Sequence, residues 1–461
     1  MAVVSFRLAS SRIRQTSEIS ELLSRPVSAY PFRTMYIQSA TIEGIRSVRR
    51  LTWKCPADVK FAGWHVILGD NGAGKSSFLR AISLLLTGPK EAPGLRQDWD
   101  AWMRRDFGHS SIRVDLDHER GADHWAGQGR TGENFYLRAR LDLDRGDSEI
   151  TTDWTGDPDP KRHVWSGKDG WFSAAFGPFR RFAGGEANHR ALFYSHPRLA
   201  RHLSVFGEDV ALSECLEWLR QLKHEKLESG DDNHLLDRVQ RFVNESELLP
   251  QGARIAEVTA KGVRFVDGND CNVPVEELSD GFRSILSLTF ELIRQMAQVY
   301  GDDNLFDETN PTAIAMPGVV LIDEIDAHLH PVWQRRIGPW FCQHFPKVQF
   351  FVTTHSPIIC QAAEHGTVYR LPTPGTDEKG GMITGDELNR LIHGNIADAY
   401  ATGVFGIKVA RSPSTQRMLA RLAELNQLEL GGKLTALQRR EQTKLRATFP
   451  TTPHSLAPLS T

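Results

Sequence analysis

The chain has 461 residues, 40% of them hydrophobic and 24% charged, so it can bury a sizeable core, and its length favours two lobes over one domain. Its formal net charge of −2 gives no attraction of the whole chain to nucleic acid, so any DNA contact needs a local patch. No apolar run approaches the ~18–20 residues that span a bilayer. The five widely spaced cysteines lack a C-x-x-C pair, which favours a reducing cytoplasm and argues against a zinc site.

Residues 1–34 differ in composition from the rest, because they are rich in arginine and serine and contain only two acids, Glu18 and Glu21. An organelle transit peptide has a similar composition. We favour the alternative that Met35 is the natural start and that residues 1–34 are a flexible extension. The segment 36–45 already has the pattern of an opening strand.

A phosphate-binding pattern, G-x-x-x-x-G-K-[ST], lies between a predicted strand at 64–68 and a predicted helix at 78–86. A glycine-rich turn before a helix offers backbone N–H groups and positive potential to phosphates, so we expect a bound nucleoside triphosphate. Lys75 would contact the β- and γ-phosphates and the Ser76 hydroxyl would ligate Mg²⁺. The alternative is a glycine-rich turn with a surface lysine. The predicted binding residues are Gly69, Asn71, Gly72, Ala73, Gly74, Lys75, Ser76 and Ser77.

The long interval between this loop and the next motif must contain structure of its own. Strand patterns at 111–116 and 134–141 are followed by amphipathic helical patterns from Asp209 to Leu222 and at 235–243, which predict a short helical arm. The heptads of a long coiled coil are absent from the sequence.

The segment 176–182, with Arg190, Arg198 and Arg201 nearby, mixes aromatic and basic residues. It could contact a nucleotide or a nucleic-acid backbone. A packed aromatic turn with solvated arginines is the alternative.

Polar residues then appear at a helix start and at two strand ends. Ser279 and Gly281 precede a helical run at 285–293 and form an anion-binding turn or else a simple helix cap.

Asp323 and Glu324 follow a buried strand pattern. Asp323 would ligate Mg²⁺ through water and Glu324 would act as a base; the alternative is that both are solvated acids. His355, after the strand pattern 348–354, would contact the γ-phosphate or is a buried core histidine.

Over residues 35–362 the chain resembles the ABC-type ATPase heads of the SMC, RecF and OLD group. The resemblance rests on the order of four motifs: the phosphate loop, L-S-D-G-F, apolar-D-E and T-T-H-S. The strings D-E-I-D-A-H-L-H-P-V-W-Q and T-T-H-S-P resemble the stand-alone ATPases of phage-defence operons, including the Septu, retron-linked and PARIS ATPases. The resemblance implies an α/β fold: an ABC-ATPase head, a P-loop NTPase, with a mixed sheet, a helical insertion between Walker A and signature, and a C-terminal helical hairpin.

The resemblance also implies ATP and Mg²⁺ as cofactors and a head-to-tail dimer or higher homo-oligomer, in which Ser279 and Gly281 close over the partner's ATP. Arg46, in the turn after the first strand, would approach the nucleotide or is a surface charge, and Trp333 faces the dimer or packs its helix. Asp280 and Phe282 depart from the transporter signature. No glutamine loop can be placed, Gln97 being the nearest candidate.

The implied function is ATP hydrolysis that gates a separately encoded effector, such as a nuclease or toxin of the same operon. The implied setting is cytoplasmic antiphage defence. DNA or a phage-derived molecule would be the trigger, and no membrane partner is expected. A RecF-like DNA-repair ATPase and a non-hydrolysing scaffold are the alternatives. Retention of Glu324 argues against the scaffold.

Beyond the motifs, helical patterns at 412–429 and 435–447 predict a hairpin that docks an effector or packs on the head. The predicted organisation is an extension at 1–34, a first lobe at 35–116, an insertion at 117–270, a second lobe at 271–362, and a helical extension with a disordered tail at 363–461.

Overall fold

The computed structural model describes residues 35–95, 97–118, 137–146, 149–157, 159–162, 164–165, 171–180, 196–207, 214–229, 234–259, 262–376, 378–394, 399 and 412–449. Residues 1–34 and the predicted tail from Pro450 lie outside these ranges. The chain divides into two compact units, Met1–Ile383 and Thr384–Thr461. Each is described by itself.

An antiparallel sheet of five strands opens the first unit, in the order β2-β1-β4-β5-β6. In β1 buried residues alternate with half-buried ones over much of its length, as expected of a strand with one face on the core. The strands are β1 (Met35–Ile45), β2 (Val48–Lys54), β4 (His109–His118), β5 (Leu137–Arg145) and β6 (Ile150–Asp157).

The second sheet has six strands in the order β14-β13-β3-β12-β11-β7. All neighbours are parallel except β13 and β14. Every residue of β3, β11 and β12 is buried, which explains their continuous apolar sequences. The strands are β3 (Gly63–Leu68), β7 (Ser173–Phe176), β11 (Gly318–Ile322), β12 (Val348–Thr354), β13 (Gly366–Arg370) and β14 (Gly381–Met382).

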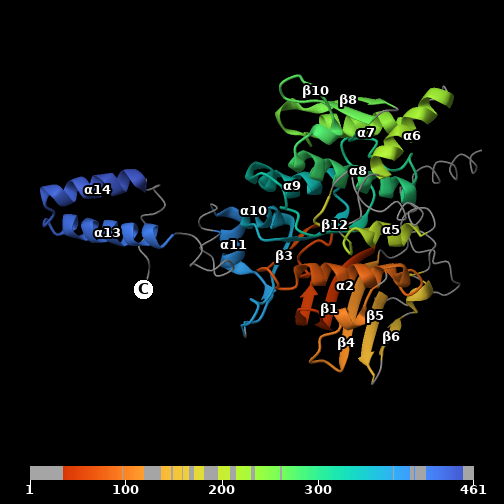
Figure 1. The fold of residues 1–461 in the computed structure, drawn as a ribbon, viewed down its shortest axis with the longest axis horizontal. Coiled ribbons are helices and arrows are strands. Elements are labelled where there is room, and N and C mark those ends of the chain that lie inside the picture. The colour runs from red at the N-terminus through yellow and green to blue at the C-terminus, as the bar shows by residue number, and fades with distance from the viewer. Residues whose placement is uncertain are drawn as a thin grey trace, which may run out of the picture. The chain divides into compact units, whose positions relative to one another are not determined.

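The two sheets are joined by helix α2 (Lys75–Thr87), which contacts strands of both and lies between them in Figure 1. Buried polar bridges add to this contact. The Gln349 side chain of β12 accepts from the Ile37 amide of β1 at 2.7 Å and donates to its carbonyl at 2.9 Å. Trp53 Nε1 of β2 donates to Thr367 Oγ1 of β13 at 3.3 Å.

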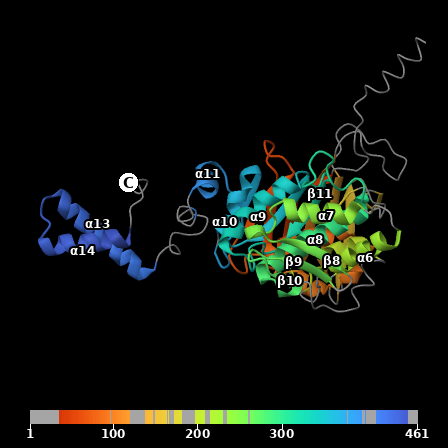
Figure 2. The same ribbon diagram turned by 90° about the horizontal axis from the view of Figure 1, so that it is seen from above.

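A third, antiparallel sheet of order β10-β9-β8 accompanies the helical insertion. It forms one cluster with α6 and α7 beside α8 (Figures 1 and 2). The strands are β8 (Arg254–Thr259), β9 (Gly262–Val266) and β10 (Asn272–Pro274). Besides α2, the helices of the described residues in this unit are α3 (Trp99–Trp102), α5 (Pro197–Leu203), α6 (Glu214–Ser229), α7 (His234–Glu245), α8 (Asp280–Tyr300), α9 (Pro331–His344) and α10 (Pro357–Cys360). Short 3-10 turns are η1 (Ala92–Leu95), η2 (Pro160–Arg162), η3 (Pro250–Gly252), η4 (Val275–Glu277) and η5 (Gln361–His365).

The second unit contains α11 (Gly385–His393) and a hairpin of α13 (Pro413–Leu430) and α14 (Ala436–Thr448). Ser412 caps α13, and Thr435 forms a capping box with Gln438 at α14. The hairpin buries Leu422, Leu425 and Leu445. The predicted hairpin is therefore present.

The predicted fold class is confirmed: the chain has the mixed sheet, the helical insertion and the C-terminal hairpin of an α/β P-loop head. Three findings differ from the expected organisation. β5 and β6 extend the first sheet, β7 lies in the second, and residues 366–382 add β13 and β14 to the second sheet instead of starting a helical extension. The boundaries at 116, 270 and 362 stay predictions. None of the described helices is long and apolar enough to cross a membrane.

Candidate functional site

The glycine-rich loop connects the carboxyl end of β3 to the first turn of α2, as the sequence predicts. Gly74 caps the helix with φ 104°, in the left-handed region that favours glycine. A Cβ at Gly74 would lie 2.8 Å from Val48 Cγ2 and 3.0 Å from Ser47 Oγ, so the turn after β1 lies directly against the loop. The amides of the first turn of α2 have no partner within the helix and are available to an anion.

Lys75 curls back over this loop. Its Nζ donates to Gly69 O at 2.9 Å and Asp70 O at 3.0 Å, and it lies 3.4 Å from His355 Nδ1. Burial lowers the pKa of Lys75, while the carboxylates of Glu324, Asp323, Asp326 and Asp70 act in the opposite direction. The loop and the end of β12 therefore meet around one buried cation.

The carboxylates after β11 are held by threonines at the end of β12. Thr353 Oγ1 donates to Asp323 Oδ1 at 2.5 Å and accepts from the Glu324 amide at 2.7 Å. Asp323 is only 1% exposed, so it is not a solvated acid, whereas Glu324 is half-buried. Glu324 has φ 45°, an uncommon conformation for a residue with a side chain. Thr354 Oγ1 donates to Asp326 Oδ1 at 2.6 Å.

Asp323, Glu324, Lys75 and His355 therefore gather at the carboxyl ends of three adjacent parallel strands, β11, β12 and β3. His355 is half-buried, so it is not a core histidine. No role was predicted for Thr353 or Thr354, although both stand in the T-T-H-S string. Threonine is common in strands for packing reasons, so its hydroxyl gave no separate signal.

The signature residues begin α8. Ser279 is the N-cap residue, is exposed, and makes no side-chain capping bond, while Asp280 pairs with Arg283. A Cβ at Gly281 would lie 3.0 Å from His328 O, so glycine permits contact with the loop after β11. Trp333 is 8% exposed and packs its helix under Arg336, whose Cζ is 5.5 Å from the ring.

Arg46 is half-buried in the turn that touches Gly74. Its guanidinium lies 4.7 Å from the Trp102 ring, and its buried Nε has no hydrogen-bond partner among the described residues. Burial, followed by repulsion from Arg80, lowers its pKa. Gln97 donates to Leu95 O and accepts from Trp102 Nε1, so both ends of its amide have local partners.

The arginines of the aromatic–basic segment are packed rather than presented to a ligand. Arg180, Arg198 and Arg201 are each 5–6% exposed. Arg198 donates to Val164 O at 2.8 Å and Arg201 to Ser173 O at 3.1 Å. These three side chains are therefore neither presented to a nucleic-acid backbone nor solvated, so both interpretations of them are wrong, and Arg181 and Arg190 lie outside the described residues.

The donor set fits Mg²⁺. Among the described residues no group of three or more His, Cys, Asp or Glu side chains could hold a metal alone. Mg²⁺ beside a nucleotide needs fewer protein ligands, because phosphates and waters complete its shell. The half-exposed Ser76 hydroxyl and the Asp323 carboxylate are oxygen donors of the right type.

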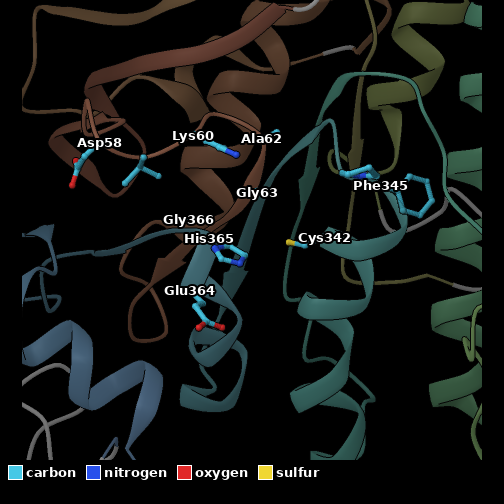
Figure 3. Close-up of a pocket in the computed structure, with 11 residues that line it drawn as sticks. Asp58, Lys60, Ala62, Gly63, Cys342, Phe345, Glu364, His365 and Gly366 are labelled. Atoms are coloured by element: carbon cyan, nitrogen blue, oxygen red, sulfur yellow. The ribbon is translucent and has the colours of Figure 1, made fainter. Parts of the chain in front are cut away.

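A separate cavity of about 410 Å³ lies at the opposite edge of the sheet. Gly63 and Gly366, the first residues of β3 and β13, line it, and Figure 3 shows Cys342 and His365 on opposite walls. Burial raises the pKa of Cys342 to about 12, so its thiol is not activated. This cavity is not the nucleotide site.

Comparison with known proteins agrees with this geometry. Residues 155–361 match the family model described as "AAA domain, putative AbiEii toxin, Type IV TA system", and residues 39–163 match an "AAA domain" model. The Septu protein PtuA of Bacillus mycoides is 24% identical over 366 residues, covering 78% of this chain and 44% of that protein. The Retron Ec83 probable ATPase of Escherichia coli is 37% identical over 107 residues, covering 23% of this chain and 18% of that protein.

The chain is thus similar in sequence to Septu and retron ATPases. It spans less than half the length of these relatives. Among solved structures, an SMC head bound to the C-winged helix domain of ScpA has a TM-score of 0.47 at 12% identity and covers 76% of this chain and 97% of its own. A RecF structure has a TM-score of 0.42 at 12% identity and covers 77% of this chain and its own full length.

Proposed function

We propose that this protein binds and hydrolyses ATP. The observation that supports it most is the convergence of the glycine-rich loop, Asp323 with Glu324, and His355 at the carboxyl ends of β3, β11 and β12. The loop amides and Lys75 would bind the phosphates, His355 would contact the γ-phosphate, and Glu324 would accept the proton of the attacking water.

Bound between Ser76, Asp323 and the phosphates, Mg²⁺ would neutralise charge that develops on the phosphate oxygens. Thr353 then has two tasks. Its hydroxyl orients the Asp323 carboxylate, and its oxygen accepts from the Glu324 amide, so one side chain fixes both acids. Arg46, which lies in the turn that touches the loop and has an unused buried donor, is a further nucleotide-binding candidate.

Two copies would complete each site. Ser279 is exposed at a helix start and its side chain makes no capping bond, which suits contact with a phosphate held by another copy. Val332, in the first turn of α9 that follows the loop after β11, is 61% exposed. We therefore propose a head-to-tail dimer that closes on ATP.

Similarity to Septu and retron ATPases supports a defence setting for the proposed cycle. The relatives are named as a Septu protein and a retron probable ATPase, and residues 155–361 of this chain match an AAA-domain model. We propose that ATP-driven closure gates a separately encoded effector, and that the hairpin α13–α14, with Leu430 and Leu437 at 90% and 78% exposure, takes part in that contact.

Hydrolysis is tested with Lys75→Ala. This variant should lose ATP binding and turnover, because the loop loses its phosphate-binding cation. The exposed Lys90→Ala is the matched control and should behave as wild type. Unchanged turnover in purified Lys75→Ala would contradict the assignment.

Composite sites are tested by mixing two inactive variants, Lys75→Ala and Ser279→Arg. A heterodimer of the two has one site with both residues intact, so random exchange should restore about one quarter of wild-type turnover. No recovery, with dimers shown by light scattering, would argue against completion of the site by a second copy.

Effector control is tested by expressing the chain with the neighbouring genes of its native operon and purifying it by affinity. Leu430→Glu with Leu437→Glu should keep ATP turnover but lose the co-purifying effector. Retention of a normally regulated effector by this variant would exclude the hairpin tip. Salt-sensitive DNA-end binding without any effector would favour a repair function instead.

A further inference from the structure

Arg180 is buried next to the proposed catalytic turn, in a segment that the proposed mechanism does not use. It lies four residues after β7 and is 5% exposed. Nη1 donates to Asp323 O at 2.8 Å and Gly177 O at 3.0 Å, and Nη2 donates to Glu324 O at 3.1 Å and Ile325 O at 3.4 Å. One planar guanidinium therefore holds three consecutive carbonyls after β11.

Arg180 adds donors to a turn that has few backbone hydrogen bonds of its own. β11 ends at Ile322, and beyond it the Asp323 amide donates to Phe176 O at 2.8 Å and Glu324 O accepts from the Ala327 amide at 2.9 Å. Glu324 also has φ 45°, a conformation that costs about 1–3 kcal/mol and persists only when its surroundings fix it. The fixed fork of an arginine supplies several aligned donors at once, which a lysine cannot do.

Arg180 also balances charge at this turn. Burial lowers its pKa to about 10, and attraction to Asp323, Asp326 and Glu324 opposes that shift, so the guanidinium is charged at neutral pH. Together with Lys75 it offsets a concentration of three carboxylates. The residue reaches these acids from behind the turn, through backbone carbonyls, and so is not placed to touch a nucleotide.

The remaining donor of Arg180 points to the signature helix. Nε donates to Ser284 Oγ at 3.1 Å, and Ser284 is 2% exposed in the second turn of α8. The same helix touches the loop after β11 a second time, where Gly281 meets His328 O. The start of α8 is thus linked to the backbone of Glu324 through a buried side chain.

We propose that Arg180 is a positioning residue that couples the placement of the signature helix α8 to the backbone that carries Glu324. This inference rests on the proposed ATPase function. When a second copy's nucleotide engages Ser279 and Gly281, a shift of α8 is passed through Ser284 and Arg180 to the turn at Glu324, which sets the base for hydrolysis. Without that contact the turn relaxes.

The sharpest test removes only the link. Ser284→Ala deletes the acceptor of Arg180 Nε and leaves the four carbonyl contacts in place. Ser287→Ala is the matched control, because Ser287 is also buried on α8 and donates to Ser284 O without touching Arg180. Ser284→Ala should lower kcat about tenfold with KM for ATP unchanged, whereas Ser287→Ala should stay within about twofold of wild type.

Two substitutions of Arg180 separate its charge from its geometry. Arg180→Met should lower kcat about 100-fold with little change in KM. Arg180→Lys restores the charge but not the fork and should recover only part of that loss. Full recovery in Arg180→Lys, or equal kcat in Ser284→Ala and Ser287→Ala, would overturn the proposal.

Amide hydrogen exchange provides a readout that does not depend on hydrolysis. The Ile325 amide donates to Thr353 O at 3.1 Å and the Ala327 amide to Glu324 O at 2.9 Å, so both report on the turn. They should exchange faster in Ser284→Ala and Arg180→Met than in Ser287→Ala. If wild type fails to hydrolyse ATP but this difference appears, the proposed function fails and the coupling stands. If hydrolysis is normal and the amides do not respond, only the coupling fails.

Discussion

The nucleotide end of the second sheet and the hairpin α13–α14 are stabilised in opposite ways. At the sheet, Lys75 meets His355 across 280 positions of the chain, and Arg180 meets the Asp323 carbonyl across 143. In the hairpin, Arg421 and Glu441 are 20 positions apart and Gln442 and Asn426 are 16 apart. The sheet end depends on contacts between segments far apart in the sequence, and the hairpin on partly buried or exposed contacts between neighbouring helices.

This difference predicts different stability. The hairpin core consists of three buried leucines with Leu434 and Phe449 packed against them. In the first unit, α2 packs against the five-stranded and six-stranded sheets through a much larger cluster of buried aromatic and aliphatic side chains. Opening of the hairpin should therefore require much less free energy than unfolding of the sheet.

The largest expected effect tests whether the sheet end carries the chemistry. Glu324→Gln removes the proposed base and should lower ATP turnover by about 10²–10⁴ while the variant keeps ATP and accumulates closed dimers. Turnover is measured by phosphate release and dimers by light scattering. Glu364→Gln, at the opposite edge of the same sheet, is the control and should match wild type. Wild-type turnover in Glu324→Gln would mean that the carboxyl ends of the strands, where Glu324 lies, do not carry the catalytic base.

A smaller effect concerns the support of that base. Thr353→Val leaves the Glu324 amide without its acceptor and Asp323 without a donor, so unfolding free energy should fall by about 1–3 kcal/mol. Turnover should fall as well. Thr367→Val removes a comparable buried hydroxyl, bonded to Trp53 and near His65, and should cost similar stability without a kcat effect. Equal kcat in the two variants would contradict the role of Thr353.

The motif residues of the nucleotide site and Arg180 differ in how well the sequence predicts them. An apolar strand that ends in Asp-Glu, and a glycine-rich loop between strand and helix, are visible in residue types, so the site was predicted from sequence. Arg180 was noticed only as part of an aromatic–basic segment, because its acceptors are mostly backbone carbonyls, which carry no residue-type signal. The roles proposed for the site residues stay predictions.

Among the helices and strands, too, those with local sequence signals were predicted and those without them were not. The hairpin helices were predicted within one residue at each end, since caps at Ser412 and Thr435 are local signals. The strands β8 and β9 were not predicted, although Val263 and Phe265 are buried in alternation with their neighbours. Strands this short become definite only through pairing with distant or looped-back segments.

Acid should affect the sheet before the hairpin. Burial lowers the pKa of His65 to about 4, opposed by the hydrogen bond to Phe61 O. Because the folded pKa lies below the unfolded value of about 6.5, His65 contributes stability above pH 6.5 that is lost as pH falls towards 4, up to about 3 kcal/mol. His202 acts in the same direction, chiefly through burial.

The hairpin contains no histidine, and its carboxylates lose their contribution only at lower pH. Hydrogen bonds from Gln442 and Arg446 lower the pKa of Glu429, and Arg421 lowers that of Glu441, so both act above about pH 4.5 and fail below it. At pH 5.5, amides of the sheet should therefore exchange hydrogen faster than at neutral pH, whereas amides of the hairpin should exchange at an unchanged rate. His65→Gln should make the loss of sheet stability with falling pH less steep, whereas the exposed His365→Gln should leave it unchanged. Equal pH dependence of exchange in the two variants would exclude His65 as the source of that loss.

The smallest expected effect on turnover comes from opening the hairpin itself. Leu425 is fully buried between α13 and α14, so Leu425→Ala should cost the hairpin about 2–5 kcal/mol, enough to unfold a unit with so small a core. Met418→Ala, at a position 37% exposed on the same helix, is the matched control. Hydrogen exchange should show α13 and α14 unprotected in Leu425→Ala only, while ATP turnover stays within about twofold of wild type because the long-range contacts at Lys75, Thr353 and Arg180 are untouched. A parallel loss of turnover would mean that the hairpin contributes to the ATP cycle directly, and the contrast between a catalytic sheet and a separate partner-binding hairpin would have to be given up.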